Sequence, residues 1–185
     1  MPGGVRPVRH RVAVSMDGFI AGPNGETDWI VPDPTADWSA VYAGFDTVLL
    51  GRRTYELTRQ PGAPAWPADW RVQVFSRTLD PAEDPTVTVV KTDAAAAVAA
   101  LRAETGRDIW LFGGASLFAS LLAADLVDRL EVAIMPVVLG RGVPLLAPDA
   151  PRARLVLTDS RASPGGIVSL DYDVQHAEPG ARLQS

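Results

Sequence analysis

The sequence of 185 residues contains no cysteine and only two histidines, and each shortage excludes a kind of site. Without cysteine the chain has no disulfide, no thiolate metal centre and no cysteine nucleophile, which fits a reducing compartment. His10 and His176 lie near opposite ends of the chain, and neither has another metal-ligating side chain at a suitable spacing. We therefore expect no metal ion.

Long apolar runs and an excess of positive charge are also missing. No stretch approaches the roughly 20 apolar residues that a bilayer span requires, and the N-terminus has no apolar signal region. The formal net charge of -5, from 17 basic and 22 acidic residues, repels a phosphate backbone unless arginines gather locally. These features predict a cytoplasmic protein with no membrane contact and no nucleic-acid partner.

The composition is that of one ordinary globular domain, with 47% hydrophobic and 21% charged residues. Residues 1–7 are rich in glycine and proline and residues 175–185 are polar, so we expect both ends to be flexible. The folded domain is expected to span residues 8–174.

Hydrophobic periodicity predicts strands and helices that alternate in the first part of the chain. Strands are expected at residues 8–15, 47–51, 72–76, 87–91, 109–112, 129–136, 154–159 and 167–174. Helices are expected at residues 35–43, in the alanine-rich segment that begins at Thr92 or Asp93 and closes at Gly106, and after Gly114. Residues 163–166 join the last two strands as a hairpin, which predicts a mixed sheet, parallel first and with an antiparallel C-terminal edge.

The turn after the strand at residues 109–112 is a candidate phosphate site. Its residues Gly113, Gly114, Ala115 and Ser116 are small, so the backbone N–H groups at the start of the next helix are open to an anion. A strand-to-helix turn also needs small residues for steric reasons alone, so the glycine pair by itself is equally compatible with packing.

Two further turns combine arginine with hydroxyl groups directly after a predicted strand. One is Gly51-Arg52-Arg53-Thr54 and the other is Ser76-Arg77-Thr78. Arginine suits bidentate recognition of phosphate, although each turn is also compatible with a solvated basic loop. Because ligands collect beyond the carboxyl ends of the strands in open α/β sheets, we expect the three turns to meet on one extended phosphorylated molecule.

A dinucleotide fits this description. Arginine near the adenosine ribose favours the additional 2′-phosphate, and hence NADPH over NADH. The G-x-G-x-x-G fingerprint is absent, so an ordinary Rossmann domain is not indicated.

Six segments in this order resemble the signatures of dihydrofolate-reductase-like proteins, the family related to the C-terminal reductase domain of the bifunctional riboflavin-biosynthesis deaminase/reductase. They are Ser15–Ala21, Gly25–Trp29, Leu50–Glu56, Phe75–Leu79, Trp110–Ala115 and Pro136–Gly142. The resemblance covers about residues 8–174, and its specificity lies in the order of the segments.

The resemblance implies a three-layer α/β fold, a mixed eight-stranded sheet with helices on both faces, that binds NADPH in an extended pose. It implies that Ala13 and Ile20 touch the nicotinamide and that Trp29 covers the site. The remaining cofactor residues that it implies are Gly51, Arg52, Arg53 and Thr54 at phosphates, Ser76 and Arg77 at the adenosine 2′-phosphate, and Phe112, Gly113, Gly114, Ala115, Ser116 and Leu117, the last five at the pyrophosphate. Because relatives often form homodimers, we also expect a homodimer.

The chain departs from the better-known members of this family. Riboflavin-pathway reductase domains place a glutamate just before the glycine pair, where this chain has Phe112. The chain also lacks a deaminase domain and a Cys/His zinc motif. Dihydrofolate reductases carry an acidic residue in the helix after the mobile loop, which assists proton delivery. Asp33 and Asp37 lie in that neighbourhood and are the catalytic candidates.

Three features are open to a structural interpretation. Asp17, before Gly18, is a candidate acid, but Asp-Gly is a common turn pair and the turn is favoured. Trp110 and Phe112 are expected in the core rather than in the site. The segment around Ser116 resembles a nucleophile elbow with Phe118 in place of the second glycine, which disfavours a serine hydrolase.

The sequence thus predicts hydride transfer from NADPH to a small planar heterocyclic or carbonyl substrate, pterin-like or pyrimidine-like, with the proton supplied by water or by Asp33 or Asp37. The resemblance implies an enzyme similar to 5-amino-6-(5-phosphoribosylamino)uracil reductase or to dihydrofolate reductase. One alternative is a non-catalytic NADPH-binding or sensor protein of the same fold. Another is nucleic-acid binding through the arginines, which predicts an affinity that falls steeply with salt.

Overall fold

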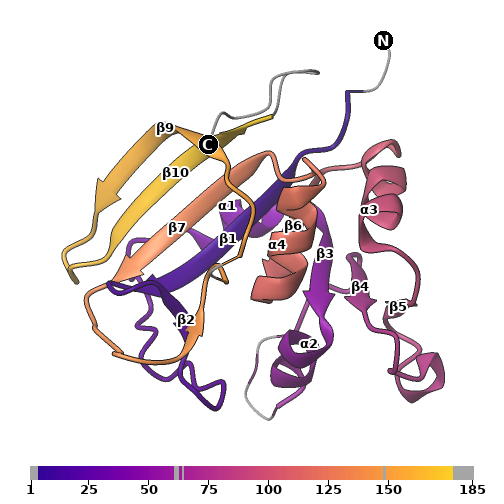
Figure 1. Cartoon of the computed structure of the whole chain (residues 1–185), viewed down its shortest axis with the longest axis horizontal. Helices are drawn as coiled ribbons and strands as arrows, with labels where there is room; N and C mark the ends of the chain where they lie inside the picture. Colours follow the sequence, from indigo (N-terminus) through magenta and orange to yellow (C-terminus); the bar gives the residue numbers. More distant parts are fainter. Residues whose placement is uncertain (1–3, 61–62, 64, 148, 177–185) are drawn as a thin grey trace.

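An eight-stranded mixed sheet forms the centre of the computed structural model, which describes residues 4–60, 63, 65–147 and 149–176 (Figure 1). Along the sheet the strands follow the order β5-β4-β3-β6-β1-β7-β10-β9. Their bounds are β1 Val8–Ser15, β3 Phe45–Gly51, β4 Arg71–Phe75, β5 Thr88–Val90, β6 Asp108–Gly113, β7 Arg129–Met135, β9 Arg154–Ala162 and β10 Val168–Gln175. The six strands from β5 to β7 run parallel, and β10 and β9 add an antiparallel edge, as expected.

Helices cover both faces of this sheet, which makes three layers (Figure 1). The helices are α1 Trp38–Ala43, α2 Arg52–Thr58, α3 Ala94–Arg102 and α4 Ala115–Ala123, with a 3-10 turn at Pro81–Glu83. A separate two-stranded sheet pairs β2 Phe19–Ala21 with β8 Val143–Pro144. The expected three-layer α/β architecture with a mixed eight-stranded sheet is confirmed.

Two apolar clusters fill the space on either side of the sheet. Under α3 and α4, the buried side chains include Leu49, Leu111 and Phe118. On the face covered by α1, the cluster combines aliphatic with aromatic side chains and includes Phe45 and Trp110. Alternate residues of the same strands supply both clusters, because successive side chains of a strand point to opposite faces.

The sequence analysis expected the alanine-rich helix to close at Gly106. The helix instead ends at Arg102, with Ala103 as its C-cap. Gly106 is needed for close packing instead, because a Cβ atom there would lie 2.7 Å from a carboxylate oxygen of Asp46. The glycine therefore allows the loop before β6 to pack closely against β3.

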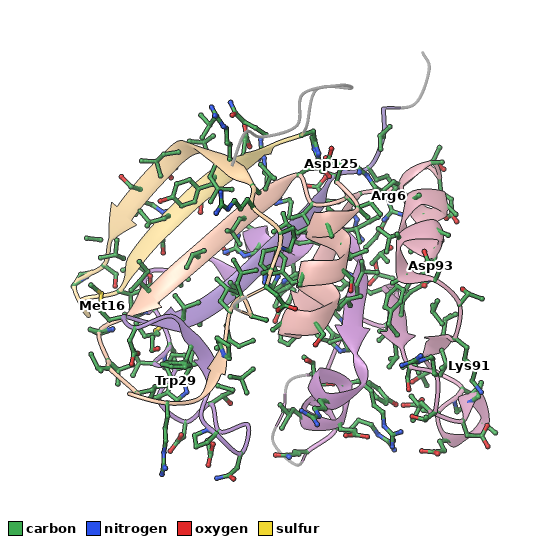
Figure 2. All side chains as sticks on the ribbon, viewed as in Figure 1. Arg6, Met16, Trp29, Lys91, Asp93 and Asp125 are labelled. Carbon is green, nitrogen blue, oxygen red and sulfur yellow. The ribbon has the colours of Figure 1, made fainter. Side chains whose placement is uncertain are left out.

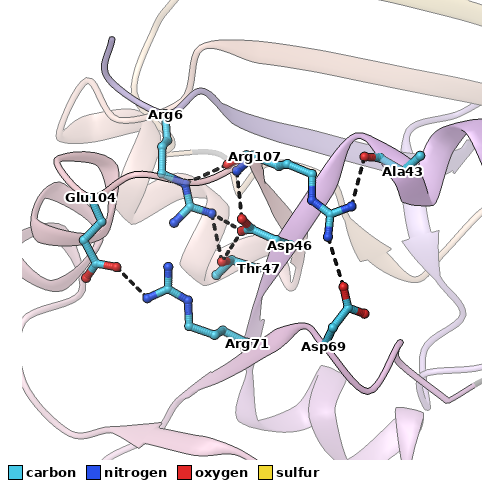
Figure 3. A network of polar contacts seen from close by, with 8 residues as sticks. All are labelled: Arg6, Ala43, Asp46, Thr47, Asp69, Arg71, Glu104 and Arg107. Carbon is cyan, nitrogen blue, oxygen red and sulfur yellow. Dashed lines mark hydrogen bonds and ion pairs between the residues drawn. The ribbon is translucent and has the colours of Figure 1, made fainter. Parts of the chain in front are cut away.

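A polar network at the amino ends of the strands fixes the start of the domain (Figure 3). Arg6 is only 2% exposed, and its Nε donates to the carbonyl oxygen of Arg107 at 2.7 Å. Its guanidinium also donates to the hydroxyl of Thr47 at 2.9 Å and to the carboxylate of Asp46. Packed structure therefore begins at Arg6, ahead of the expected boundary at Val8. Residues 1–3 and 177–185 of the expected flexible ends lie outside the described residues.

The edge strand β9 is exposed along all nine residues, and no described helix covers it. Leu155, Leu157 and Val168 expose 41%, 52% and 39% of their surface. In the described part of the chain, no helix is both long and apolar enough to span a membrane.

The homodimer stays a prediction. We expect the mass of the purified protein in light scattering to be twice the 19.7 kDa of one chain, because an exposed edge strand such as β9, with exposed apolar side chains, can pair with a second copy of the chain. A mass of one chain at micromolar concentration would contradict it.

Candidate functional site

The carboxyl ends of three neighbouring strands carry the three turns that the sequence analysis singled out. Strands β4, β3 and β6 are consecutive in the sheet and parallel, and they end at Phe75, Gly51 and Gly113. The turns that follow therefore lie side by side along one edge, at the bottom of Figure 1, where α2 begins. The predicted convergence of the turns is present in the structure.

Direct contacts connect the three turns. A Cβ atom on Gly51 would lie 3.5 Å from the backbone nitrogen of Gly114, so the first and last turns nearly touch. The guanidinium of Arg52 donates to the hydroxyl of Thr78, which joins the first turn to the second. The three turns thus form one continuous polar surface.

The turn at Gly113 and Gly114 leaves the start of α4 open. Gly113 has φ +136°, a conformation that side-chain-bearing residues rarely adopt, and the peptide bond to Gly114 is cis. No side chain caps α4, whereas Asp37 and Asp93 cap α1 and α3. The unpaired N–H groups in the first turn of α4 consequently face no carboxylate and are suited to an anion.

Thr54 contributes a hydroxyl to the same place. A Cβ atom on Gly114 would lie 3.1 Å from its Oγ1. The side chain is half-buried, and within the described residues its hydroxyl has no hydrogen-bond partner. Thr54 can therefore donate to a phosphate oxygen held at the glycine pair.

The arginines of these turns differ in their partners. Arg52 forms an ion pair with Glu56 at 2.7 Å in addition to its bond to Thr78. Arg53 and Arg77 are exposed and make no hydrogen bond or ion pair within the described residues. These two guanidinium groups are accordingly available to a ligand without breaking an existing contact.

Ser76 supports the second turn from inside. Its hydroxyl accepts hydrogen bonds from the backbone N–H groups of Thr78, at 3.2 Å, and Leu79, at 3.0 Å. This arrangement holds the backbone that presents Arg77 at the edge of the sheet.

Asp17 links the turn after β1 to the loop after β7. Its carboxylate accepts backbone N–H bonds from Leu139 at 3.1 Å and Gly140 at 2.7 Å. The hydroxyl of Ser15 donates to it at 2.6 Å, and this bond is the main reason why the pKa of Asp17 is lowered. An ionised carboxylate that orders two loops fits the turn-stabilising interpretation rather than a proton donor.

The residues implied at the nicotinamide lie near the end of β1. Ala13 is half-buried on β1 in register with Ala133 of β7, and Ile20 lies in β2, which packs beside β1. Trp29 lies near β2 in Figure 2, and its indole nitrogen donates to the carbonyl oxygen of Glu26 at 3.1 Å. Contact of these three residues with a cofactor stays a prediction.

Asp33 and Asp37, the catalytic candidates, both act in local turns. Asp33 accepts from the hydroxyl of Thr35 at 2.6 Å and from its backbone N–H at 2.9 Å. These two bonds lower the pKa of Asp33, the hydroxyl bond most strongly. Asp37 caps α1 by accepting from the N–H of Ala40 at 3.0 Å. The geometry thus favours structural roles, and proton donation by either residue stays a prediction.

An aromatic hollow next to the glycine pair was not predicted from the sequence. It has a volume of about 350 Å³ and is lined by Trp38, Tyr42, Trp110 and Phe112. Trp110 is 4% exposed and belongs to the core, as expected, but it also forms one wall of the hollow. Two large rings at alternate positions of a strand that ends in Gly-Gly are the sequence signal for it.

The sheet order and the turns at its carboxyl edge define a dihydrofolate-reductase-like protein. More specifically, the chain belongs to the RibD C-terminal domain family, whose model matches residues 6–169.

Two proteins of Bacillus subtilis (strain 168) are similar along most of their length. YyaP is 34% identical over 172 residues, which cover 87% of this chain and 91% of YyaP. YwjB is 35% identical over 165 residues, which cover 87% of this chain and 94% of YwjB. Both are described as uncharacterized proteins.

Solved structures agree with the fold. A protein from Shewanella sp. PV-4, described as a riboflavin biosynthesis protein, has a TM-score of 0.79 at 25% identity and covers 92% of this chain and 99% of its own. The deaminase/5-amino-6-(5-phosphoribosylamino)uracil reductase of Thermotoga maritima has a TM-score of 0.70 at 16% identity. This chain covers 57% of that bifunctional protein.

Proposed function

We propose that this protein is an NADPH-dependent reductase of a small planar heterocyclic or carbonyl compound. The observation that carries the proposal is the continuous surface formed by the turns after β4, β3 and β6. An extended dinucleotide with several phosphates matches such a surface better than a compact ligand does. The name of the Thermotoga maritima relative, a deaminase/reductase, supports a reductase as well.

The residues present fit NADPH. The uncapped start of α4 and the hydroxyl of Thr54 would hold the pyrophosphate, and Arg77 would hold the 2′-phosphate. When bound, the cofactor supplies a hydride from C4 of its nicotinamide. Trp29 would exclude water from that ring. Because the carboxylates of Asp33 and Asp37 are engaged in turns, we propose that a water molecule delivers the proton.

Titration with NADPH tests the cofactor, and a panel of pterins, pyrimidines and quinones tests turnover. We expect saturable binding and oxidation of NADPH that at least one acceptor stimulates. Tight binding with no oxidation by any acceptor would favour the alternative of a non-catalytic NADPH-binding protein. No saturable binding would exclude both.

Replacement of Thr54 by valine tests the pyrophosphate site. We expect the dissociation constant of NADPH to rise about tenfold, because a hydrogen bond to a charged oxygen is lost. The free energy of unfolding should change little, since the hydroxyl has no protein partner among the described residues.

Thr58→Val is the matched control on the same helix. The hydroxyl of Thr58 donates to the carbonyl oxygen of Tyr55 at 2.8 Å. It therefore bonds within α2 and does not belong to the turns at the carboxyl edge of the sheet. Equal affinity for NADPH in the wild-type protein and in Thr54→Val would show that the hydroxyl of Thr54 does not bind the cofactor.

A further inference from the structure

The aromatic hollow lies beside the turn assigned to the pyrophosphate. Phe112, which lines it, is directly followed by Gly113 and Gly114. Trp110 lies on the same face of β6 as Phe112, and α1 supplies the opposite side through Trp38 and Tyr42. One wall of the hollow is therefore covalently continuous with the turn assigned to the pyrophosphate.

The walls of the hollow are aromatic rings held by other aromatic rings. The ring centroids of Trp110 and Phe112 are 5.5 Å apart, and those of Tyr42 and Trp110 are 5.9 Å apart. Trp66 packs edge-on against Phe112 at 5.0 Å and thereby supports this wall. Only Trp38, which is 47% exposed, stands at the rim among the lining residues.

None of the residues that line this hollow carries a positive charge. Its lining contains no arginine, lysine or histidine. Arg9 is the basic residue in register with Trp110, but it is paired with Glu131 at 2.6 Å and with Asp108 at 3.0 Å. Arg11 is likewise paired with Glu131. The face of an aromatic ring carries negative partial charge, so a phosphate placed here would be repelled and left without a counter-ion.

We infer that the hollow binds an uncharged planar aromatic or quinonoid compound without a phosphate group. This inference rests on the proposed reductase function and specifies its substrate class. A single or fused ring system can stack on the aromatic walls, and a volume of about 350 Å³ is at the small end of ligand cavities, which range from about 300 to 1,000 Å³. The Thermotoga maritima relative is named for a phosphoribosyl-bearing uracil, so this chain differs from it in substrate class.

Reduction of a quinone requires only NADPH and water as the other reactants. The quinone accepts one hydride from NADPH and one proton from water. Its two carbonyl groups become the two hydroxyl groups of the hydroquinone, while NADPH is oxidised to NADP⁺ and hydroxide remains in the solvent.

The test uses menadione, an uncharged naphthoquinone, as the probe. Quenching of tryptophan fluorescence measures its binding without cofactor, and oxidation of NADPH measures its turnover. We expect saturable quenching, and we expect 5-amino-6-(5-phosphoribosylamino)uracil neither to compete with menadione nor to stimulate oxidation of NADPH.

Trp38→Ala should weaken the binding of menadione about tenfold, because it removes one ring on which the ligand stacks. Trp38→Phe should restore most of the affinity. Trp38 lies outside the residues assigned to the cofactor, so binding of NADPH should not change. Val31→Ala is the control, because Val31 has the same exposed fraction of 47% and does not line the hollow.

Two results would overturn the inference. One is tighter binding of the phosphoribosyl compound than of menadione, and the other is unchanged binding of menadione in Trp38→Ala. Absence of NADPH binding together with intact menadione binding would instead contradict the proposed reductase and leave the specificity of the hollow standing.

Discussion

Replacing Arg77 with alanine is expected to weaken the binding of NADPH by about 10- to 100-fold while the binding of NADH changes little. The two cofactors differ by the 2′-phosphate, and a charge-assisted contact to phosphate contributes about 1–3 kcal/mol. The guanidinium of Arg77 is exposed and has no partner in the described part of the chain, so its loss removes no contact within the protein. Titration of both cofactors against the wild-type protein and Arg77→Ala measures the effect.

Arg154→Ala is a suitable control for this experiment. Arg154 is also an exposed arginine without a partner in the described residues, but it begins β9 at the far edge of the sheet. Its removal changes the net charge equally and should leave both affinities unchanged. An equal loss of NADPH and NADH affinity in Arg77→Ala would show that Arg77 does not read the 2′-phosphate.

Acidification from pH 6.5 to pH 4 is expected to destabilise the folded protein by up to about 3 kcal/mol through His10 alone. Its ring is 2% exposed and stacks on Phe118 with the ring centroids 4.2 Å apart, and its Nδ1 lies 2.7 Å from the carbonyl oxygen of Leu111. Burial lowers the pKa of His10 from 6.5 to about 4, and the bond to Leu111 opposes this only in part. A difference of one pKa unit corresponds to about 1.4 kcal/mol.

The direction follows from proton binding in the two states. Between pH 6.5 and pH 4 the imidazole is protonated in the unfolded chain and neutral in the folded one, so protons favour unfolding. The free energy of unfolding therefore falls as the pH falls through this range, and the contribution of His10 becomes constant below pH 4. Chemical denaturation at several pH values measures this slope.

His10→Gln should reduce the slope, because glutamine can still donate to the carbonyl oxygen of Leu111 but does not titrate. The carboxylates contribute equally to the pH dependence of unfolding in the wild-type protein and in His10→Gln, so the difference between the two slopes reports on His10. Identical slopes for the wild-type protein and His10→Gln would contradict the assignment.

Much of the fold could be predicted because its strands are marked locally. The alternation in residues 8–15 and the apolar run that ends at Gly51 correspond to β1 and β3. One helix and two strands were missed, namely α2, β2 and β8, as was the 3-10 turn at Pro81–Glu83. Strands β2 and β8 have only three and two residues and exist because they pair with each other across more than a hundred residues of sequence. Such short segments carry too little periodicity to be recognised.

The candidate site was predicted in part for the same reason. Glycine, hydroxyl and arginine side chains directly after a strand are a local pattern, and the structure brings these three turns together. The sequence did not distinguish Arg52, which is paired with Glu56, from Arg77, which is not. Nor did it show that Asp17 bonds to a loop more than a hundred residues away.

Composition and local pattern by themselves determined the α/β class, the positions of the main strands and the chemistry of the strand-end turns. Tertiary structure alone decided that β4, β3 and β6 are neighbours, that α1 faces β6 across an aromatic hollow, and which charges are already paired. The reason is that propensity and turn chemistry act over a few residues, whereas a site is made by side chains that burial brings together from distant parts of the chain.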